Sequence, residues 1–217
     1  MVLDNFIVFE GIDGAGTTTQ LNILKEKPEC KNFLFTAEPT VSPTGKILRN
    51  ILKGEIKVKN ETAAYFFAAD RNEHINGELK TENSMLVTGV KEACSKGKIV
   101  ISDRYFFSSL AYQSTGCSPE IPRVLNSLFP LPKLLFYFEI TPEVSLSRIS
   151  SRNVREIYEK VDFLKVTVEE YHKVLEEYSH PDKNQGMKIV KLDATKPKEE
   201  IASLIWNEIQ AVYKNSL

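Results

Sequence analysis

Two stretches of the chain combine residue types that bind phosphate and a divalent cation. The first, residues 9–20, reads FEGIDGAGTTTQ. Gly11, four further residues and then Gly16 followed by Thr17-Thr18 has the spacing of a phosphate-binding P-loop. The glycines let backbone N–H groups converge on one concavity, at which the following helix points its positive dipole end. Thr18 stands where the motif places a hydroxyl for Mg²⁺.

This motif has two unusual residues. Thr17 stands where the P-loop has the lysine that reaches the β- and γ-phosphates. Asp13 places an acid inside a loop that would hold anions. The spacing alone therefore leaves open an ordinary glycine-rich turn between a strand and a helix.

The second stretch is residues 99–105, IVISDRY, an apolar run that ends in an acid and a base. Asp103 has the position of a Walker-B-like carboxylate, which holds Mg²⁺ directly or through water. Arg104 can clamp phosphate oxygens with its guanidinium fork. The alternative is a plain ion pair at the end of a strand. Ser109, Tyr112 and Gln113 follow on an expected helical turn.

A pair of side chains between these stretches could recognise a planar base. Phe67 and Arg71 are four residues apart, and on a helix they are neighbours on one face. An aromatic ring beside a guanidinium can stack on a base and hydrogen-bond its edge. A core phenylalanine with an arginine extending past it is the alternative. Residues 36–45 with Arg49 read as a second polar segment, or as a Pro/Gly turn with a surface arginine.

Short apolar runs separated by helical patterns indicate the elements that must position these residues. Continuous runs of this kind are typical of strands buried on both faces of a sheet. The runs are residues 6–9, 33–35, 99–101, 134–140 and 189–192. Strands that alternate with helices predict a parallel, doubly wound sheet with ligands at its carboxyl edge. The predicted helical faces are Leu86, Val90 and Ala93; Phe163, Val166, Glu170 and Val174; and Ile201, Leu204, Ile205, Ile209 and Val212. Residues 114–119 and 180–186 read as loops.

The composition is that of an ordinary globular protein. With 217 residues, 42% hydrophobic and 26% charged, the chain is expected to form one domain, residues 1–217. A net charge of -1 gives no electrostatic reason to expect nucleic acid or an anionic membrane as a partner. The 3 cysteines suggest neither a disulfide framework nor a zinc site. No secretory signal or membrane span is evident, so we expect a cytoplasmic protein.

Taken together, the motifs resemble those of thymidylate kinases, in the bacterial form of the family. The strings FEGIDGAG, EP with TG and a later R, FAADRNEH, SDRYFFSSLAYQ and LDATKP occur in the order found there, over nearly the whole chain. The resemblance implies an α/β P-loop NTPase three-layer fold, with a five-stranded parallel sheet flanked by helices and a short lid near residues 148–160. It also implies a homodimer. The implied reaction is the ATP-dependent phosphorylation of dTMP to dTDP with Mg²⁺, for dTTP synthesis.

The resemblance further assigns residues to each substrate. Asp13 would lie near the 3′-hydroxyl of dTMP, Phe67 would stack on thymine and Tyr112 would exclude ribonucleotides. Asp13, Arg104, Arg152 and Arg155 are the implied catalytic residues, the last two in the lid, and Thr18 and Asp103 the metal ligands. The implied ATP-binding residues are Gly11, Ile12, Asp13, Gly14, Ala15, Gly16, Thr17, Thr18, Thr195, Lys196 and Pro197. Those for dTMP are Asp13, Arg49, Phe67, Arg71, Arg104, Ser109, Tyr112, Gln113 and Tyr158.

Departures from the family pattern leave two further interpretations open. Thr17 lacks the lysine's charge, and Ala37 stands where the bacterial pattern usually has arginine. We hypothesise that Arg152 or Arg155 takes over the work of the lysine. A nucleotide-binding P-loop protein of the same fold, with little or no phosphoryl transfer, is the alternative function. A kinase for another nucleoside monophosphate is the third.

Overall fold

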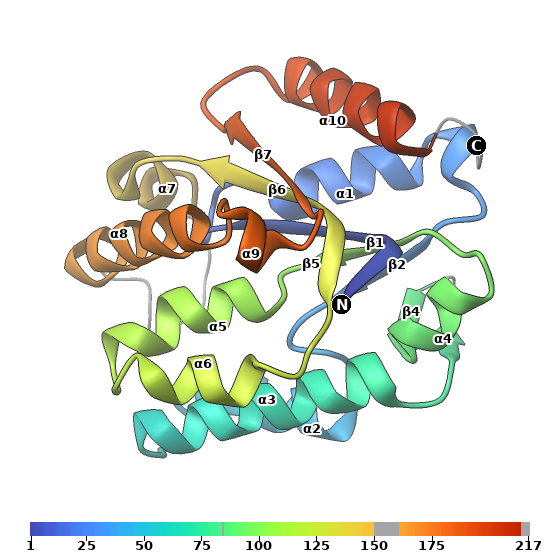
Figure 1. Ribbon diagram of the computed structural model, residues 1–217. Helices are drawn as coiled ribbons and strands as arrows, with labels where there is room; N and C mark the ends of the chain where they lie inside the picture. Colours follow the sequence, from blue (N-terminus) through green and yellow to red (C-terminus); the bar gives the residue numbers. More distant parts are fainter. Residues whose placement is uncertain (84, 150–160, 214–217) are drawn as a thin grey trace.

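The computed structural model describes residues 1–83, 85–149 and 161–213, which form helices packed on a central sheet (Figure 1). The strands are β1 (Val2–Gly11), β2 (Leu34–Ala37), β3 (Lys80–Glu82), β4 (Met85–Thr88), β5 (Val100–Asp103), β6 (Leu131–Glu139) and β7 (Lys188–Asp193). The α-helices are α1 (Thr17–Lys25), α2 (Pro43–Leu52), α3 (Asn60–Asn76), α4 (Val90–Ser95), α5 (Phe106–Tyr112), α6 (Glu120–Asn126), α7 (Pro142–Ile149), α8 (Val161–Glu177), α9 (Pro181–Asn184) and α10 (Lys198–Tyr213). Two 3₁₀ turns, η1 (Pro28–Cys30) and η2 (Gln113–Thr115), complete the described elements.

The sheet has the strand order β3-β4-β2-β5-β1-β6-β7. β1 lies between β5 and β6 and pairs with both in parallel, with Phe9 opposite Asp103 and Phe136. The carboxyl ends of β1, β2 and β5 therefore meet at one edge, as expected of a doubly wound sheet. The five predicted apolar runs all form strands of this sheet.

The predicted number of five strands was wrong, because the described residues form a seven-stranded sheet. β4 adds beside β2 in parallel, and β3 pairs with β4 antiparallel, so the sheet is mixed. Leu86, which we had predicted to lie on a helical face, belongs to β4. Its spacing from Val90 and Ala93 matches a helical face, but these two residues alone belong to a helix. In the structure Gly89, at φ 88°, separates the strand from the short helix α4.

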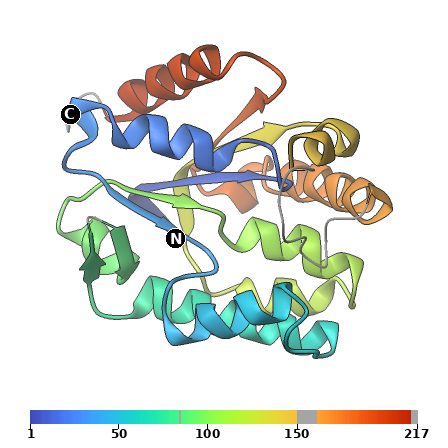
Figure 2. The same cartoon turned by 180° about the vertical axis from the view of Figure 1, so that it is seen from behind.

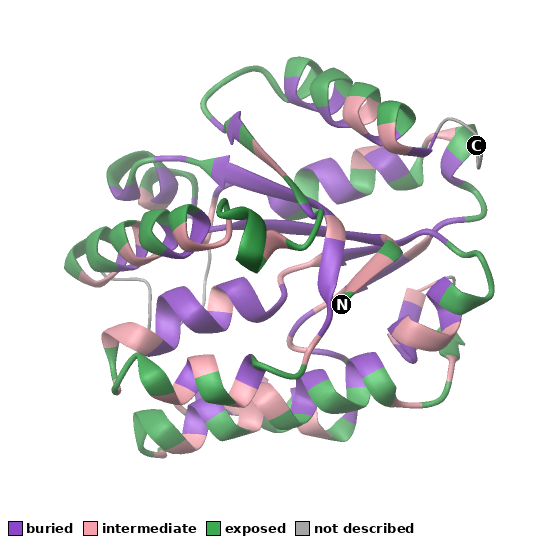
Figure 3. Ribbon diagram, viewed as in Figure 1, coloured by how far each residue is buried: buried purple, intermediate pink, exposed green. Residues whose placement is uncertain are grey.

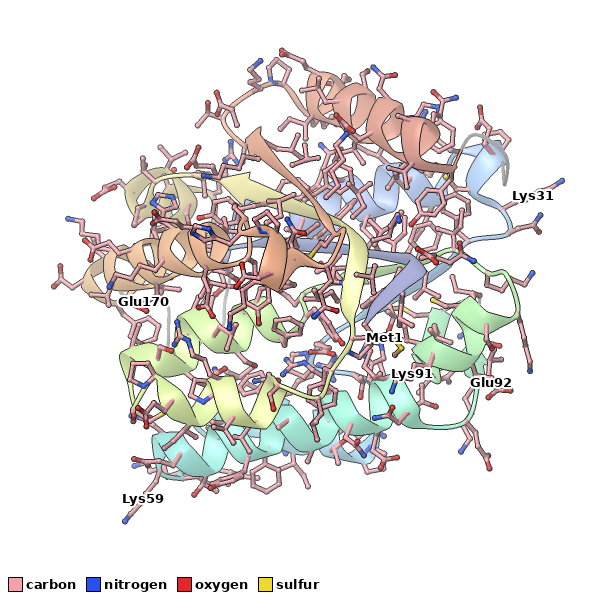
Figure 4. The ribbon with its side chains drawn as sticks, in the orientation of Figure 1. Met1, Lys31, Lys59, Lys91, Glu92 and Glu170 are labelled. Atoms are coloured by element: carbon pink, nitrogen blue, oxygen red, sulfur yellow. The ribbon has the colours of Figure 1, made fainter. Side chains whose placement is uncertain are left out.

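Helices cover both faces of the sheet, which gives the expected three layers. Figure 1 and the opposite view in Figure 2 place α1 and α10 together on one face, and α3, α5 and α6 on the other. The second half of β1, from Phe6 to Gly11, and nearly all of β6 are buried between these layers (Figure 3). Charged side chains such as Lys31 and Lys59 extend outward from the periphery (Figure 4). Among the described residues no helix is long and apolar enough to cross a membrane.

Two other helical predictions need correction. On α8 the buried face is Leu164, Thr167, Tyr171 and Val174, whereas Val166 is exposed. The apolar pattern was misleading because the buried face includes Tyr171, a residue with a polar hydroxyl, which donates a hydrogen bond to Glu10 inside the protein. Residues 180–186, predicted as a loop, contain the short helix α9. The predicted lid lies outside the described residues from position 150 to position 160.

Candidate active site

The predicted P-loop connects β1 to α1 at the carboxyl edge of the sheet. Gly14 and Gly16 have φ angles of 81° and 98°, which favour glycine. A Cβ on Gly14 would also lie 2.6 Å from the carbonyl oxygen of Ser145 on α7. The N-cap of α1, Gly16, offers no side-chain hydrogen bond, and the first turn contains no acid. The cap residue therefore supplies no side-chain acceptor to the N–H groups at the start of α1. This leaves those groups able to bind an anion.

Thr18 and Asp103 lie side by side at this edge although they are 85 residues apart in sequence. Thr18 Oγ1 donates a hydrogen bond to Asp103 Oδ2 over 2.6 Å. Asp103 Oδ1 is buried and has no hydrogen-bond partner. A buried carboxylate oxygen without a donor fits a cation ligand. The described residues contain no cluster of three or more His, Cys, Asp or Glu side chains able to hold a metal. This pair therefore fits Mg²⁺, which takes few protein ligands and retains water or substrate phosphates.

The acid inside the P-loop is paired with the arginine that follows β5. Arg104 Nη2 donates to Asp13 Oδ1 over 2.8 Å. The predicted alternative, an ion pair between Asp103 and Arg104, is not among the contacts of the described residues. The guanidinium also lies 5.7 Å from the ring centre of Tyr112, whose hydroxyl accepts a hydrogen bond from Asp13 N over 3.2 Å. These three side chains therefore form one unit beside the phosphate loop.

Arg71 is the centre of a second, buried cluster. It is 1% exposed, and its Nε and Nη2 donate to Glu38 Oε2 over 2.9 and 2.6 Å. Nη1 and Nη2 also donate to Asn126 and Ser109. These four contacts leave one of the five guanidinium N–H groups, on Nη1, without a partner among the residues that the structure describes. Arg71 is thus held rigidly, and the alternative of an arginine extending past a core phenylalanine is wrong.

The P-loop and the Arg71 cluster line one cavity of about 600 Å³. The predicted residues that line it are Asp13, Gly14, Ala15, Gly16, Thr17, Thr18, Phe67, Arg71, Asp103, Arg104, Tyr112, Gln113 and Lys196. Gln113 contributes a buried Oε1 that has no hydrogen-bond partner. Such an atom indicates a ligand that brings its own donor.

Other predicted residues lie beside the cavity rather than in its wall. Gly11, Ile12, Arg49, Ser109, Thr195 and Pro197 do not line it. The guanidinium of Arg49 donates instead to the carbonyl oxygens of Pro39 and Thr40. Ser109 supports Arg71 from behind. Arg152, Arg155 and Tyr158 lie outside the described residues.

Several residues at the site had no assigned role in the sequence prediction. Glu38 holds both Arg71 and the buried His74, whose Nδ1 lies 2.9 Å from Glu38 Oε1. Asp70 accepts hydrogen bonds from the backbone and hydroxyl of Thr40, over 2.7 and 2.6 Å. The only sequence signal was an acid directly after an apolar run or beside Arg71, which does not distinguish a site residue from a surface one.

Three features define the class of P-loop phosphotransferases. They are a P-loop at the carboxyl edge of parallel strands, the adjacent pair Thr18 and Asp103 that can bind a cation, and a cavity large enough for nucleotides. A family model described as Thymidylate kinase matches residues 9–205. The chain belongs to the thymidylate kinase family. It is a dTMP kinase, which phosphorylates dTMP to dTDP in nucleotide biosynthesis.

Relatives match over most of the chain. A protein of Treponema pallidum, provisionally named a thymidylate kinase, is 35% identical over 211 residues, which cover 96% of each chain. The probable thymidylate kinase of Methanocaldococcus jannaschii is 36% identical over 219 residues, covering 99% of this chain and 98% of its own. That of Thermococcus kodakarensis is 38% identical over 183 residues, 79% of this chain and 84% of its own.

Proposed function

We propose that the two ends of the cavity hold the two nucleotides of the reaction. ATP would place its phosphates on the P-loop, Gly11 to Thr18, with its adenine toward Thr195, Lys196 and Pro197. dTMP would occupy the end formed by Phe67, Arg71, Tyr112 and Gln113. The observation that carries this proposal is that members of both sets line one cavity, residues 13–18 and Lys196 for ATP and all four of the named residues for dTMP. Such an arrangement supplies the alignment on which phosphoryl transfer depends.

The polar groups around Phe67 suit a thymine base. Arg71 retains one N–H donor for a carbonyl oxygen on the base edge. Gln113 Oε1 has no donor of its own and suits a ring N–H. Thymine presents a carbonyl next to a ring N–H, whereas cytosine presents an amino group next to an unprotonated ring nitrogen. A cytosine base would therefore leave both protein groups unpaired, at a cost that favours dTMP.

Charge neutralisation, without a general base, accounts for the chemistry. The second pKa of a phosphate monoester is about 6, so dTMP arrives mostly as a dianion that is already nucleophilic. Arg104 would hold this phosphate, with Arg49 behind it, while Asp13 orients the sugar. His74 needs no role in proton transfer, because its ring contacts Glu38 and Thr36 over 2.9 and 2.7 Å inside the protein.

Thr18 and Asp103 would hold Mg²⁺ together with the phosphates of ATP. When bound, this ion would neutralise charge that develops on the transferred phosphoryl group. The donor types are the hard oxygen ligands that Mg²⁺ prefers. Asp103 Oδ1 is the atom without another partner, and so the better direct ligand.

The charge of the missing P-loop lysine must come from another residue. Thr17 lines the cavity but carries no charge. Most described cations in the cavity wall have partners, because Arg71 and Arg104 bind carboxylates and Arg148 donates to the carbonyls of Gly14 and Ala194. This supports assigning the task to Arg152 or Arg155 of the predicted lid. Residues 1–217 are proposed to form a single domain.

Three broader expectations remain predictions. The bacterial form of the family is one, because the relatives come from a bacterium and from archaea. A homodimer, expected from the family resemblance, and a cytoplasmic location, expected because the sequence shows no secretory signal or membrane span, are the others. The alternative of a nucleotide-binding protein without efficient transfer rests on Thr17 alone.

Release of ADP from ATP and Mg²⁺, with each nucleoside monophosphate in turn, tests the proposal. We expect dTMP to be the best acceptor, dUMP a weaker one and dCMP poor. Gln113→Leu should reduce the preference for dTMP over dCMP about tenfold, since it removes one base contact. Equal use of dTMP and dCMP by the unaltered enzyme would refute the base assignment.

A further inference from the structure

Glu10 is a buried carboxylate that the proposed phosphoryl transfer does not use. It is 0% exposed at the end of β1, directly before the P-loop. Oε1 accepts from the backbone N–H groups of Tyr105 and Ser108 over 2.8 and 3.2 Å. Oε2 accepts from Ser108 Oγ over 2.6 Å and from the Tyr171 hydroxyl over 2.9 Å. Each oxygen thus uses both lone pairs within the protein, and none remains for a substrate.

These donors connect Glu10 to both ends of Arg104. The hydroxyl of Tyr171 accepts from Arg104 Nη1 over 3.3 Å and donates onward to Glu10. The backbone bond from Tyr105 to Glu10 holds the chain at the residue directly after Arg104. Arg104 itself has a φ of 76°, which a residue other than glycine adopts only where its surroundings impose it.

The guanidinium therefore lies between two carboxylates with different tasks. Asp13 binds Nη2 directly, and its side chain is 24% exposed toward the cavity. Glu10 is connected to Nη1 by hydrogen bonds through Tyr171, and it does not line the cavity. A carboxylate that reaches the arginine through a fixed hydroxyl can set its direction without competing with a phosphate for it.

We propose that Glu10 is a positioning residue for the acceptor, which aims the guanidinium of Arg104 at the phosphate of dTMP through Tyr171. This inference rests on the proposed role of Arg104 in holding that phosphate. If Glu10 served only to stabilise the fold, its removal would affect both substrates alike or neither. A positioning role affects dTMP selectively, because Arg104 lies at the acceptor end of the cavity.

The sharpest test is Tyr171→Phe, which removes the connecting hydroxyl and retains the ring. We expect the KM for dTMP to rise about tenfold, and the KM for ATP to change by less than about twofold. Tyr213→Phe is the matched control, because its buried hydroxyl also donates one hydrogen bond, to the carbonyl of Asp4 over 2.8 Å, away from the cavity. A KM for dTMP equal in the two variants would overturn the proposal.

Glu10→Gln and Arg104→Ala complete the design. Glu10→Gln should raise the KM for dTMP to a similar extent. The double variant with Tyr171→Phe should show a smaller effect on this KM than the two single effects combined, since both changes interrupt the same connection. Glu10→Asp should not restore the KM, because the shorter side chain cannot keep all four donors. Arg104→Ala should weaken dTMP binding on its own. If it does not, the phosphate assignment itself fails; if it does while Tyr171→Phe is silent, only the role of Glu10 fails.

Discussion

Arg71 donates two hydrogen bonds to a single oxygen of Glu38, at 2.9 and 2.6 Å, and both side chains are buried. This pair joins the strand-end segment after β2 to the middle of α3. It fixes Arg71, which lines the cavity at the proposed base site. Because the charge of Arg71 is almost completely removed from water, its orientation depends on the carboxylate.

Glu38→Gln should therefore be strongly destabilising. The change leaves a buried guanidinium without its counter-charge, which costs about 3–5 kcal/mol in the free energy of unfolding. Urea unfolding monitored by circular dichroism measures this cost. Glu177→Gln is the control, because Glu177 pairs with Arg123 over 3.3 Å with both side chains partly exposed, and such pairs contribute less than about 1 kcal/mol. A similar loss in the two variants would contradict the prediction.

Asp103→Asn tests the proposed metal site without a large change of shape. Loss of the charge at Oδ1 and Oδ2 should raise the Mg²⁺ concentration needed for half-maximal activity about 10- to 100-fold. The KM for dTMP should change little, because Asp103 is not proposed to contact the acceptor. Glu139→Gln, at the exposed end of β6, is the control. The metal assignment would be wrong if Asp103→Asn and the control required the same Mg²⁺ concentration.

Thr17→Lys tests whether the missing lysine is compensated. If Arg152 or Arg155 already supplies the charge, the new lysine should raise kcat only modestly. Arg152→Ala or Arg155→Ala should then be severe, since charges of this kind contribute about 10³–10⁵ in rate. Lys198→Ala is a useful comparison, because Lys198 also lines the cavity and lies 3.8 Å from Glu199. A gain of several orders of magnitude in Thr17→Lys would exclude compensation.

The stability of the protein should fall as the pH rises toward 7. Burial raises the pKa of Glu10 from its ordinary 4.5 to about 7, while Arg104 and the hydrogen bonds from Ser108 and Tyr171 oppose the shift. Between these two pH values the folded protein binds a proton that the unfolded chain has lost. The contribution of Glu10 to the free energy of unfolding is therefore complete below pH 4.5 and is lost as the pH rises from 4.5 to 7. The total loss is about 3 kcal/mol.

Urea unfolding at pH 5, 6, 7 and 8 measures this dependence. The groups that face Glu10 are Arg104, Tyr171 of α8 and Tyr137, which is opposite Glu10 on the adjacent strand β6. Burial raises the pKa of both tyrosines further above the tested range. Glu10→Gln should flatten the dependence, whereas Tyr213→Phe should retain it. An unchanged slope in Glu10→Gln would assign the effect to other groups.

Much of the fold could be predicted because its signals are local. Five strands appeared as short apolar runs, and the P-loop appeared as glycines at a fixed spacing. Strand β3 was missed because it is short and exposed at the edge of the sheet, and β4 was missed because only two of its four residues, Leu86 and Thr88, are buried. The face of α8 was misread because its buried Tyr171 is polar at one end.

The chain by itself determined which residue types could act and at what spacing: the loop with Thr18, the strand end with Asp103, and the pair Phe67 and Arg71. Only the tertiary structure decided which of them meet. Thr18 and Asp103 are 85 residues apart, and the contact between Glu10 and Tyr171 spans 161. Such contacts depend on strand order and helix rotation, which result from packing of the whole core and leave no local pattern.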